Sequence, residues 1–239
     1  MGRNFKTIIV VILFFFGFIV QAQERSRSLE ILQKASEFYQ TGNYGLSLNY
    51  TMKSYNNKIL ESYKGISLRK EDRFYSKIGE TEFIQEGTKF LKINHEEKAI
   101  LYAIANDNSS QPIFAFKDLI DLFDKITLLD KGNYFIVKLI ANKPTQLPYS
   151  SVSIFINKAD YAIFKETLEL AIDVPVRTDS GGEKYQSAYI ELTIKKQPQL
   201  LKNFDENKLL IKNYIQTVNK NTVAVASLKN YLFIDTTKK

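Results

Sequence analysis

Few side chains in this 239-residue sequence are of the types that carry out chemistry. His95 is the single histidine, and it stands in the polar stretch His95-Glu96-Glu97, which predicts a surface turn. The chain has no cysteine, which excludes thiolate catalysis and cysteine-based metal sites. Without other candidate partners, His95 supports neither a catalytic triad nor a metal centre. We therefore expect no metal and no cofactor.

Paired carboxylates and one glycine-containing segment are the remaining candidates for catalysis. Asp118 and Asp121 would lie on the polar face of an amphipathic helix, and the pair Asp205 and Glu206 fits a helix cap, so neither pair needs a role in acid–base chemistry. The segment Ser180 to Lys184 lacks the spacing and the Ser/Thr ending of a phosphate-binding loop and indicates a hairpin turn. We therefore expect a protein that is not an enzyme.

The N-terminus has the pattern of an export signal. Arg3 and Lys6 precede an apolar run from Ile8 to Val20, and Ala22 supplies the small residue of a cleavage site. The apolar run is shorter than the ~20 residues that a membrane-spanning helix needs. The pattern predicts a signal peptide over residues 1–22, cleaved after Ala22, and a soluble periplasmic or secreted protein. An uncleaved membrane anchor is the alternative.

The net charge argues against nucleic acid as a partner. The charge of +7 falls by two when Arg3 and Lys6 leave with the leader, and the remaining excess is scattered along the chain. Such a chain is compatible with transient, peripheral contact with anionic membranes or acidic partners. Length and composition predict one domain over residues 23–239, most simply a monomer.

The stretch from Tyr44 to Ile104 predicts a β-meander. Leu46, Leu48, Tyr50 and Met52 alternate with polar residues, which places them on one face of a strand. Similar runs predict strands at 59–69, 73–79, 81–86, 88–94, 98–104, 134–141, 150–157, 163–172, 185–195 and 222–235. In the strand at 163–172, alternation places four residues on one face: Phe164, Glu166, Leu168 and Leu170.

Three segments show helical spacing instead. They are residues 28–40, which Ser26 or Ser28 would cap, residues 113–125 after Pro112, and a last helix that begins at Asp205 or Asn207 and runs to Val218. The apolar face of the second helix carries Phe116, Leu119, Ile120 and Phe123 and must rest on the sheet. The fold class is therefore α+β, with an antiparallel sheet.

Four stretches follow one another in order: Gly65 to Tyr75 (GISLRKEDRFY), Glu86 to Asn94 (EGTKFLKIN), Pro112 to Phe123, and Lys158 to Ile163. They resemble, in turn, the strand-turn-strand around a basic turn, the "D-G-x-x-L-W-x-Y-N" stretch, the lid helix and the "D-G-x-I" hairpin of the outer-membrane lipoprotein carrier family (the LolA/LolB-like fold). The resemblance covers residues 29–205. It implies a sheet curved into an incomplete barrel, with helices covering its apolar concave face.

The resemblance implies a non-enzymatic periplasmic carrier or binding protein for a lipid or the acyl chain of a lipoprotein. The candidate ligand-lining residues, for which core packing is the alternative, are Leu48, Tyr50, Met52, Phe74, Phe116, Ile120 and Phe123. Arg69 and Arg73 are candidates for a lid tether or a docking patch, with a solvated turn as the alternative.

Two features depart from the family pattern. Glu71 stands where the family's carriers have a lid-tethering arginine, and residues 206–239 extend beyond the family's usual end as a helix and a strand. If this extension fills the hollow, no ligand fits. The departures favour an alternative function, a ligand-free interaction or assembly subunit of a cell-envelope complex with protein partners.

Overall fold

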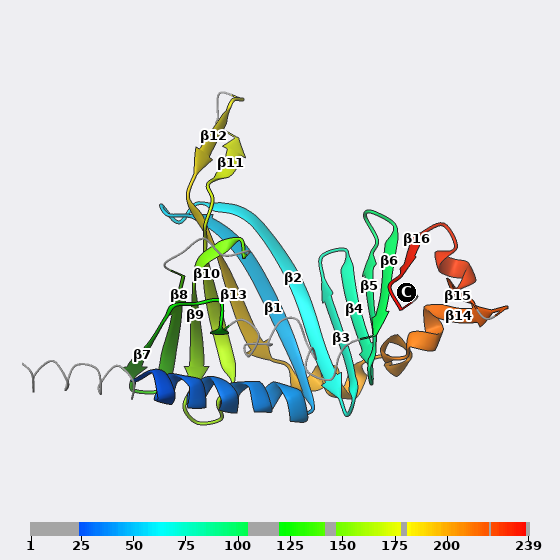
Figure 1. The fold of residues 1–239 in the computed structure, drawn as a ribbon, viewed down its shortest axis with the longest axis horizontal. Helices are drawn as coiled ribbons and strands as arrows, with labels where there is room; N and C mark the ends of the chain where they lie inside the picture. The colour runs from blue at the N-terminus through cyan, green and yellow to red at the C-terminus, as the bar shows by residue number, and fades with distance from the viewer. Residues whose placement is uncertain (1–23, 105–119, 142–146, 178–180, 220, 238–239) are drawn as a thin grey trace, which may run out of the picture.

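The computed structural model describes residues 24–104, 120–141, 147–177, 181–219 and 221–237. The predicted signal peptide and Phe116 lie outside these ranges. The described chain is mostly β, and it contains a mixed 12-stranded sheet and one substantial helix, residues 24–41 (Figure 1). Most of the second predicted helix, at 113–125, also lies outside these ranges. No helix among the described residues is long and apolar enough to cross a membrane.

The large sheet runs in the order β16-β6-β5-β4-β3-β2-β1-β13-β10-β9-β8-β7, and all neighbours are antiparallel except β16 and β6. Its strands are β1 (Tyr44–Ser54), β2 (Ile59–Lys70), β3 (Arg73–Ile78), β4 (Thr81–Glu86), β5 (Lys89–Asn94), β6 (Ala99–Ile104), β7 (Lys125–Lys131), β8 (Tyr134–Ile140), β9 (Tyr149–Asn157), β10 (Ile163–Leu170), β13 (Ala188–Lys196) and β16 (Leu232–Asp235). The two short hairpins are β11 (Val174–Arg177) with β12 (Glu183–Gln186), and β14 (Ile215–Val218) with β15 (Asn221–Ala224). The alternating runs thus predicted most of the sheet.

The helix of residues 24–41 packs across one half of the sheet, in front of β8, β9, β10 and β13 (Figure 1). The Ser28 hydroxyl donates to the Glu24 carbonyl from within this helix, so the prediction that Ser28 caps it is wrong. Tyr39, near its end, is 1% exposed, and its hydroxyl accepts from the Ile163 N–H (2.9 Å) and donates to the Ile163 carbonyl (3.1 Å). The helix is thereby fixed to the start of β10.

The sheet buries opposite faces in its two halves. We call the face that carries Leu46, Leu48 and Tyr50 on β1 the helix face, because the helix of residues 24–41 covers it. The other face, which carries Leu68 and Tyr75, we call the C-terminal face. On β1 and on β13, β10, β9 and β8 the helix face is buried, with Val137, Leu139, Ile154, Ile156, Leu192 and Ile194. On β2 to β6 the C-terminal face is buried, with Ile84, Leu91, Ile93 and Ile100.

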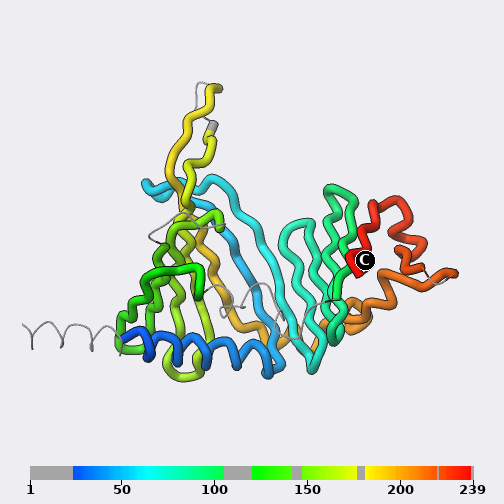
Figure 2. Tube along the Cα trace, in the orientation of Figure 1, coloured from blue at the N-terminus to red at the C-terminus, as the bar shows by residue number. Residues whose placement is uncertain are grey.

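The C-terminal segment covers this second core from the side away from the helix (Figure 2). It contains α3 (Pro198–Asn203), η1 (Glu206–Leu209), η2 (Ile211–Asn213) and η3 (Ala226–Leu228). The predicted helix to Val218 is wrong, because short 3-10 turns and β14 occupy this stretch. The predicted strand at 222–235 is likewise divided into β15, η3 and β16. The described part of this segment packs on the C-terminal face, opposite the helix face where the hollow was predicted.

The end of the predicted helix at 113–125 falls within the described residues. Ile120 is helical, a turn follows, and Lys125 already begins β7, so the last residues of this prediction are wrong. Phe123 is 3% exposed and Ile120 packs against the same core under the helix. The predicted contact of this apolar face with the sheet is thus confirmed for its described residues.

Candidate functional site

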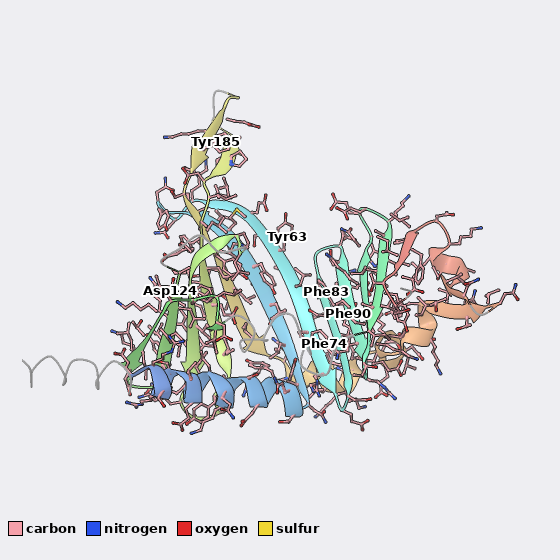
Figure 3. All side chains as sticks on the ribbon, viewed as in Figure 1. Tyr63, Phe74, Phe83, Phe90, Asp124 and Tyr185 are labelled. Atoms are coloured by element: carbon pink, nitrogen blue, oxygen red, sulfur yellow. The ribbon has the colours of Figure 1, made fainter. Side chains whose placement is uncertain are left out.

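Five consecutive strands each present at least one aromatic ring on the helix face. We call this set the aromatic strip: Tyr50 on β1, Tyr63 on β2, Phe74 on β3, Phe83 on β4 and Phe90 on β5. Figure 3 shows the labelled members of the strip in the middle of the molecule. Aromatic side chains that share one face of a sheet are candidates for contact with an apolar partner.

The strand register places the five rings on the same face. Tyr50 stands directly opposite Tyr63, and Tyr50 itself packs against the core under the helix. Phe83 and Phe90 are diagonal neighbours with ring centroids 6.4 Å apart. Of the strip residues, Tyr63 is 50% exposed, Phe83 and Phe90 are half-buried, and Phe74 is buried although it belongs to neither core.

The sheet separates the two arginines that the sequence analysis grouped together. Arg69 lies on the helix face directly opposite Phe74, and its Nε is buried without a hydrogen-bond partner. Arg73 lies on the C-terminal face, where its Nε is 3.7 Å from the Glu86 carboxylate. Glu86 in turn accepts a hydrogen bond from the N–H of Ile211 in the C-terminal segment. Arg69 alone is therefore placed beside the aromatic strip.

The predicted ligand-lining residues divide into two groups. Leu48, Tyr50, Ile120 and Phe123 come together in or against the core under the helix, and Leu48 is only 2% exposed. Met52 lies half-buried farther along β1, on the same face. Phe74 lies two strands away in the aromatic strip, and Phe116 is outside the described residues. Tyr63, Phe83 and Phe90 were not predicted.

Glu166 on β10 was also not predicted as a site residue, although its alternation with Leu168 had placed it on an apolar face. It is 6% exposed on the helix face, between Leu192 of β13 and Ile154 of β9. Burial raises the pKa of its carboxyl group to about 8. A bulge at the start of β10 turns Phe164 away, so this ring does not share the face of Glu166 as predicted.

Two tyrosines of the helix face lie near Glu166. Burial is the larger cause that raises the pKa of the Tyr50 hydroxyl, and the Glu166 carboxyl is the smaller one. The same two causes raise the pKa of the Tyr149 hydroxyl. Both tyrosines pack against the core under the helix. Tyr50 and Glu166 lie in the same row of the sheet, on either side of Leu192.

A groove of about 400 Å³ lies between the helix of residues 24–41 and Ile120. Its described lining includes Leu29, Leu32 and Ile120, and also the polar side chains of Gln33, Ser36, Glu37 and Gln40. Its mixed lining distinguishes it from the apolar hollow that a lipid carrier would use.

His95 is more enclosed than the surface turn that was predicted for it would make it. Its Nε2 lies 3.1 Å from the Glu82 carboxylate and its Nδ1 lies 2.9 Å from the Tyr231 hydroxyl. The ring thereby links the sheet to the C-terminal segment. In the part of the chain that the structure describes, no three His, Asp or Glu side chains are grouped as metal ligands.

No protein-family model and no curated protein matches the sequence. Solved structures of similar fold were found. A LolA superfamily protein from Nitrosomonas europaea is 12% identical, with a TM-score of 0.32, 70% of this chain covered and 91% of the other. An outer membrane lipoprotein-sorting protein domain from Vibrio parahaemolyticus is 14% identical, with a TM-score of 0.35 and coverages of 78% and 97%. LprF from Mycobacterium bovis is 9% identical, with a TM-score of 0.34 and coverages of 71% and 92%.

These structural neighbours are LolA-like proteins. Two of them carry the name of the family that the four sequence stretches resemble. Identity and TM-score are both low, so the likeness says nothing about ligand or partner.

Proposed function

We propose that this protein is a non-enzymatic carrier or binding protein that holds an acyl chain of a lipid or a lipoprotein against the aromatic strip. The observation that carries the proposal is the run of Tyr50, Tyr63, Phe74, Phe83 and Phe90, one ring from each of five adjacent strands on one face. Ring faces contact acyl chains without requiring polar partners. The described C-terminal segment packs on the other face of the sheet.

The same proposal includes export and the shape of the site. Residues 1–22 have the sequence of a cleaved signal peptide, which favours a periplasmic location. A curved sheet, closing as a half-barrel around the aromatic strip, would bury more of the acyl chain than a flat one. Arg69, beside Phe74, is the candidate for a lid tether or a docking contact.

The proposal is tested with the fluorescent fatty acid cis-parinaric acid and by native mass spectrometry of the gently purified protein. We expect co-purified lipid and saturable probe binding. Replacing Phe83→Ser and Phe90→Ser together should weaken probe binding about tenfold or more, since each half-buried ring loses on the order of 1 kcal/mol of apolar contact.

Phe164→Ser is the matched control. Phe164 is 37% exposed and packs on Tyr134 and Phe155, whose positions in β8 and β9 place them on the opposite face. Its replacement should leave probe binding unchanged. A wild-type protein that carries no lipid and binds no probe would refute the proposed function.

One observation favours the second candidate function, a ligand-free interaction subunit of an envelope complex. The β11–β12 hairpin projects from the body, and Tyr185 on it and Ile172 beside it are 65% and 69% exposed (Figure 1). Exposed apolar side chains on a projecting hairpin suit contact with a protein partner. Stable co-purification of an envelope protein, lost in Tyr185→Ser, together with failure to bind the lipid probe, would support this function over the carrier.

A further inference from the structure

Glu166 is the only acidic or basic residue that is buried among the described residues. Its neighbours across the strands, Leu192 and Ile154, are both aliphatic and buried. The carboxyl atom Oε1 has no hydrogen-bond partner and almost no contact with solvent. A buried polar group without a partner destabilises the fold, and a leucine of similar volume would not.

The buried carboxyl group of Glu166 therefore lowers the stability of the fold, and packing does not explain why a glutamate stands at this position. The pKa of the carboxyl is raised by burial, and no basic side chain counteracts that shift. The group consequently keeps its proton at neutral pH, and a protonated carboxyl both donates and accepts a hydrogen bond. Tyr50, two strands away in the same row of the sheet, and Tyr149, on β9, supply two further hydroxyl groups on this face.

We propose that Glu166, together with the hydroxyl groups of Tyr50 and Tyr149, forms a polar subsite that binds an uncharged hydrogen-bonding group of the lipid, such as the hydroxyl of an acylglycerol. This inference rests on the proposed function and names the ligand class for it. The subsite adjoins the aromatic strip through Tyr50, which belongs to both. One end of the ligand would thus meet the polar subsite while its chain follows the rings.

The chemistry of the subsite selects against charged ligands. An anionic fatty acid would place its carboxylate in an apolar environment beside the protonated Glu166, where no basic side chain compensates the charge. An ammonium group would require Glu166 to give up its proton in an apolar environment. An uncharged hydroxyl or ester needs neither change, and it satisfies the free Oε1 atom.

The test is displacement of bound cis-parinaric acid by monoolein, oleic acid and oleylamine, which share an 18-carbon chain length and differ in their polar group. Wild-type protein should bind monoolein most tightly. Glu166→Gln should bind it within about threefold of wild type, because the amide also donates and accepts, and Glu166→Leu should bind it about tenfold more weakly. Glu169→Leu, the same change on the same strand but on the opposite face, should have no effect.

The melting temperature separates loss of the subsite from loss of the fold. Glu166→Leu should melt at or above the wild-type temperature, so weaker monoolein binding cannot come from unfolding. If Glu166→Leu binds monoolein as tightly as wild type, the subsite is refuted while the carrier function stands. Preference for oleylamine, lost in Glu166→Gln, would refute the uncharged ligand class. If wild type binds none of the probes, the proposed function and this inference both fail.

Discussion

Replacing Ile211→Ala tests the claim that the C-terminal segment covers the face of the sheet opposite the proposed ligand site. Ile211 is 3% exposed in η2, and its N–H donates to the Glu86 carboxylate at 3.0 Å. The substitution keeps this backbone hydrogen bond and removes only side-chain contacts. Truncating a buried isoleucine to alanine lowers the free energy of unfolding by about 2–5 kcal/mol, because apolar contacts are lost and a cavity remains.

The expected result is a free energy of unfolding lower by about 3 kcal/mol, which for a chain of this size corresponds to a melting temperature lower by roughly 6–12 °C. Urea unfolding followed by circular dichroism measures the first quantity and a thermal scan the second. Ile234→Ala is the control, because Ile234 is 44% exposed on the edge strand β16 and its truncation should change stability by less than about 1 kcal/mol.

Binding of cis-parinaric acid, measured at a temperature where Ile211→Ala remains folded, should stay within about twofold of wild type, since the aromatic strip lies on the other face. A destabilisation below about 1 kcal/mol would contradict the described packing of the C-terminal segment. A folded Ile211→Ala protein that has lost more than tenfold in probe affinity would show instead that the C-terminal segment shapes the ligand site.

Two further predictions concern buried polar groups. Because burial raises the pKa of Glu166 from its ordinary 4.5 to about 8, the folded state keeps a proton that the unfolded state releases between these values. The stability from this group is therefore complete below about pH 4.5 and is lost as the pH rises through 8, so the free energy of unfolding should fall by roughly 4 kcal/mol between pH 5 and pH 8. Urea unfolding at both pH values should show a smaller fall in Glu166→Gln. An equal fall in the two proteins would refute the assignment. Tyr39→Phe should lower the free energy of unfolding by about 1–3 kcal/mol, because it leaves the N–H and carbonyl of Ile163 unpaired. Tyr185→Phe, at an exposed tyrosine, should change it little in the same denaturation experiment, and equal effects of the two changes would count against the Tyr39 contact.

Alternation along single strands predicted the β-rich part of this fold well. The apolar face of β1, with Leu46 and Leu48, is buried as expected. The edge strand β7 was missed because Lys125 follows a stretch with helical spacing, and because Leu128 and Leu129 are adjacent and break the alternation. Local spacing cannot decide between such possibilities when tertiary contacts determine the outcome.

The C-terminal segment shows the same limit more clearly. Leu210, Ile211, Tyr214 and Ile215 have helical spacing, which predicted a helix there. The structure instead buries Leu209, Ile211 and Ile215 against the sheet from 3-10 turns and a short strand. Contacts with residues distant in sequence override a local preference of a few tenths of a kcal/mol per residue.

The candidate site was only partly predictable, because it depends on register between strands. The sequence places Tyr63 on the opposite face of its strand from Leu68, but not beside Tyr50. The alignment of Phe83 and Phe90 likewise follows only from the pairing of β4 with β5. For this reason Leu48 and Phe123, which the sequence suggested as ligand-lining, are core residues, while the aromatic strip was recognised only in the structure.

The pairing of β1 with β13 has a consequence for how the chain folds during its synthesis. Leu46 lies opposite Lys196, so β1 has its neighbour on this side only after most of the chain is made. The core on the C-terminal face also waits for Leu209, Ile211 and Ile215. Contacts between such distant residues form slowly, and neither half can close early during synthesis. Both hydrophobic cores are therefore completed only when the last third of the chain has been made.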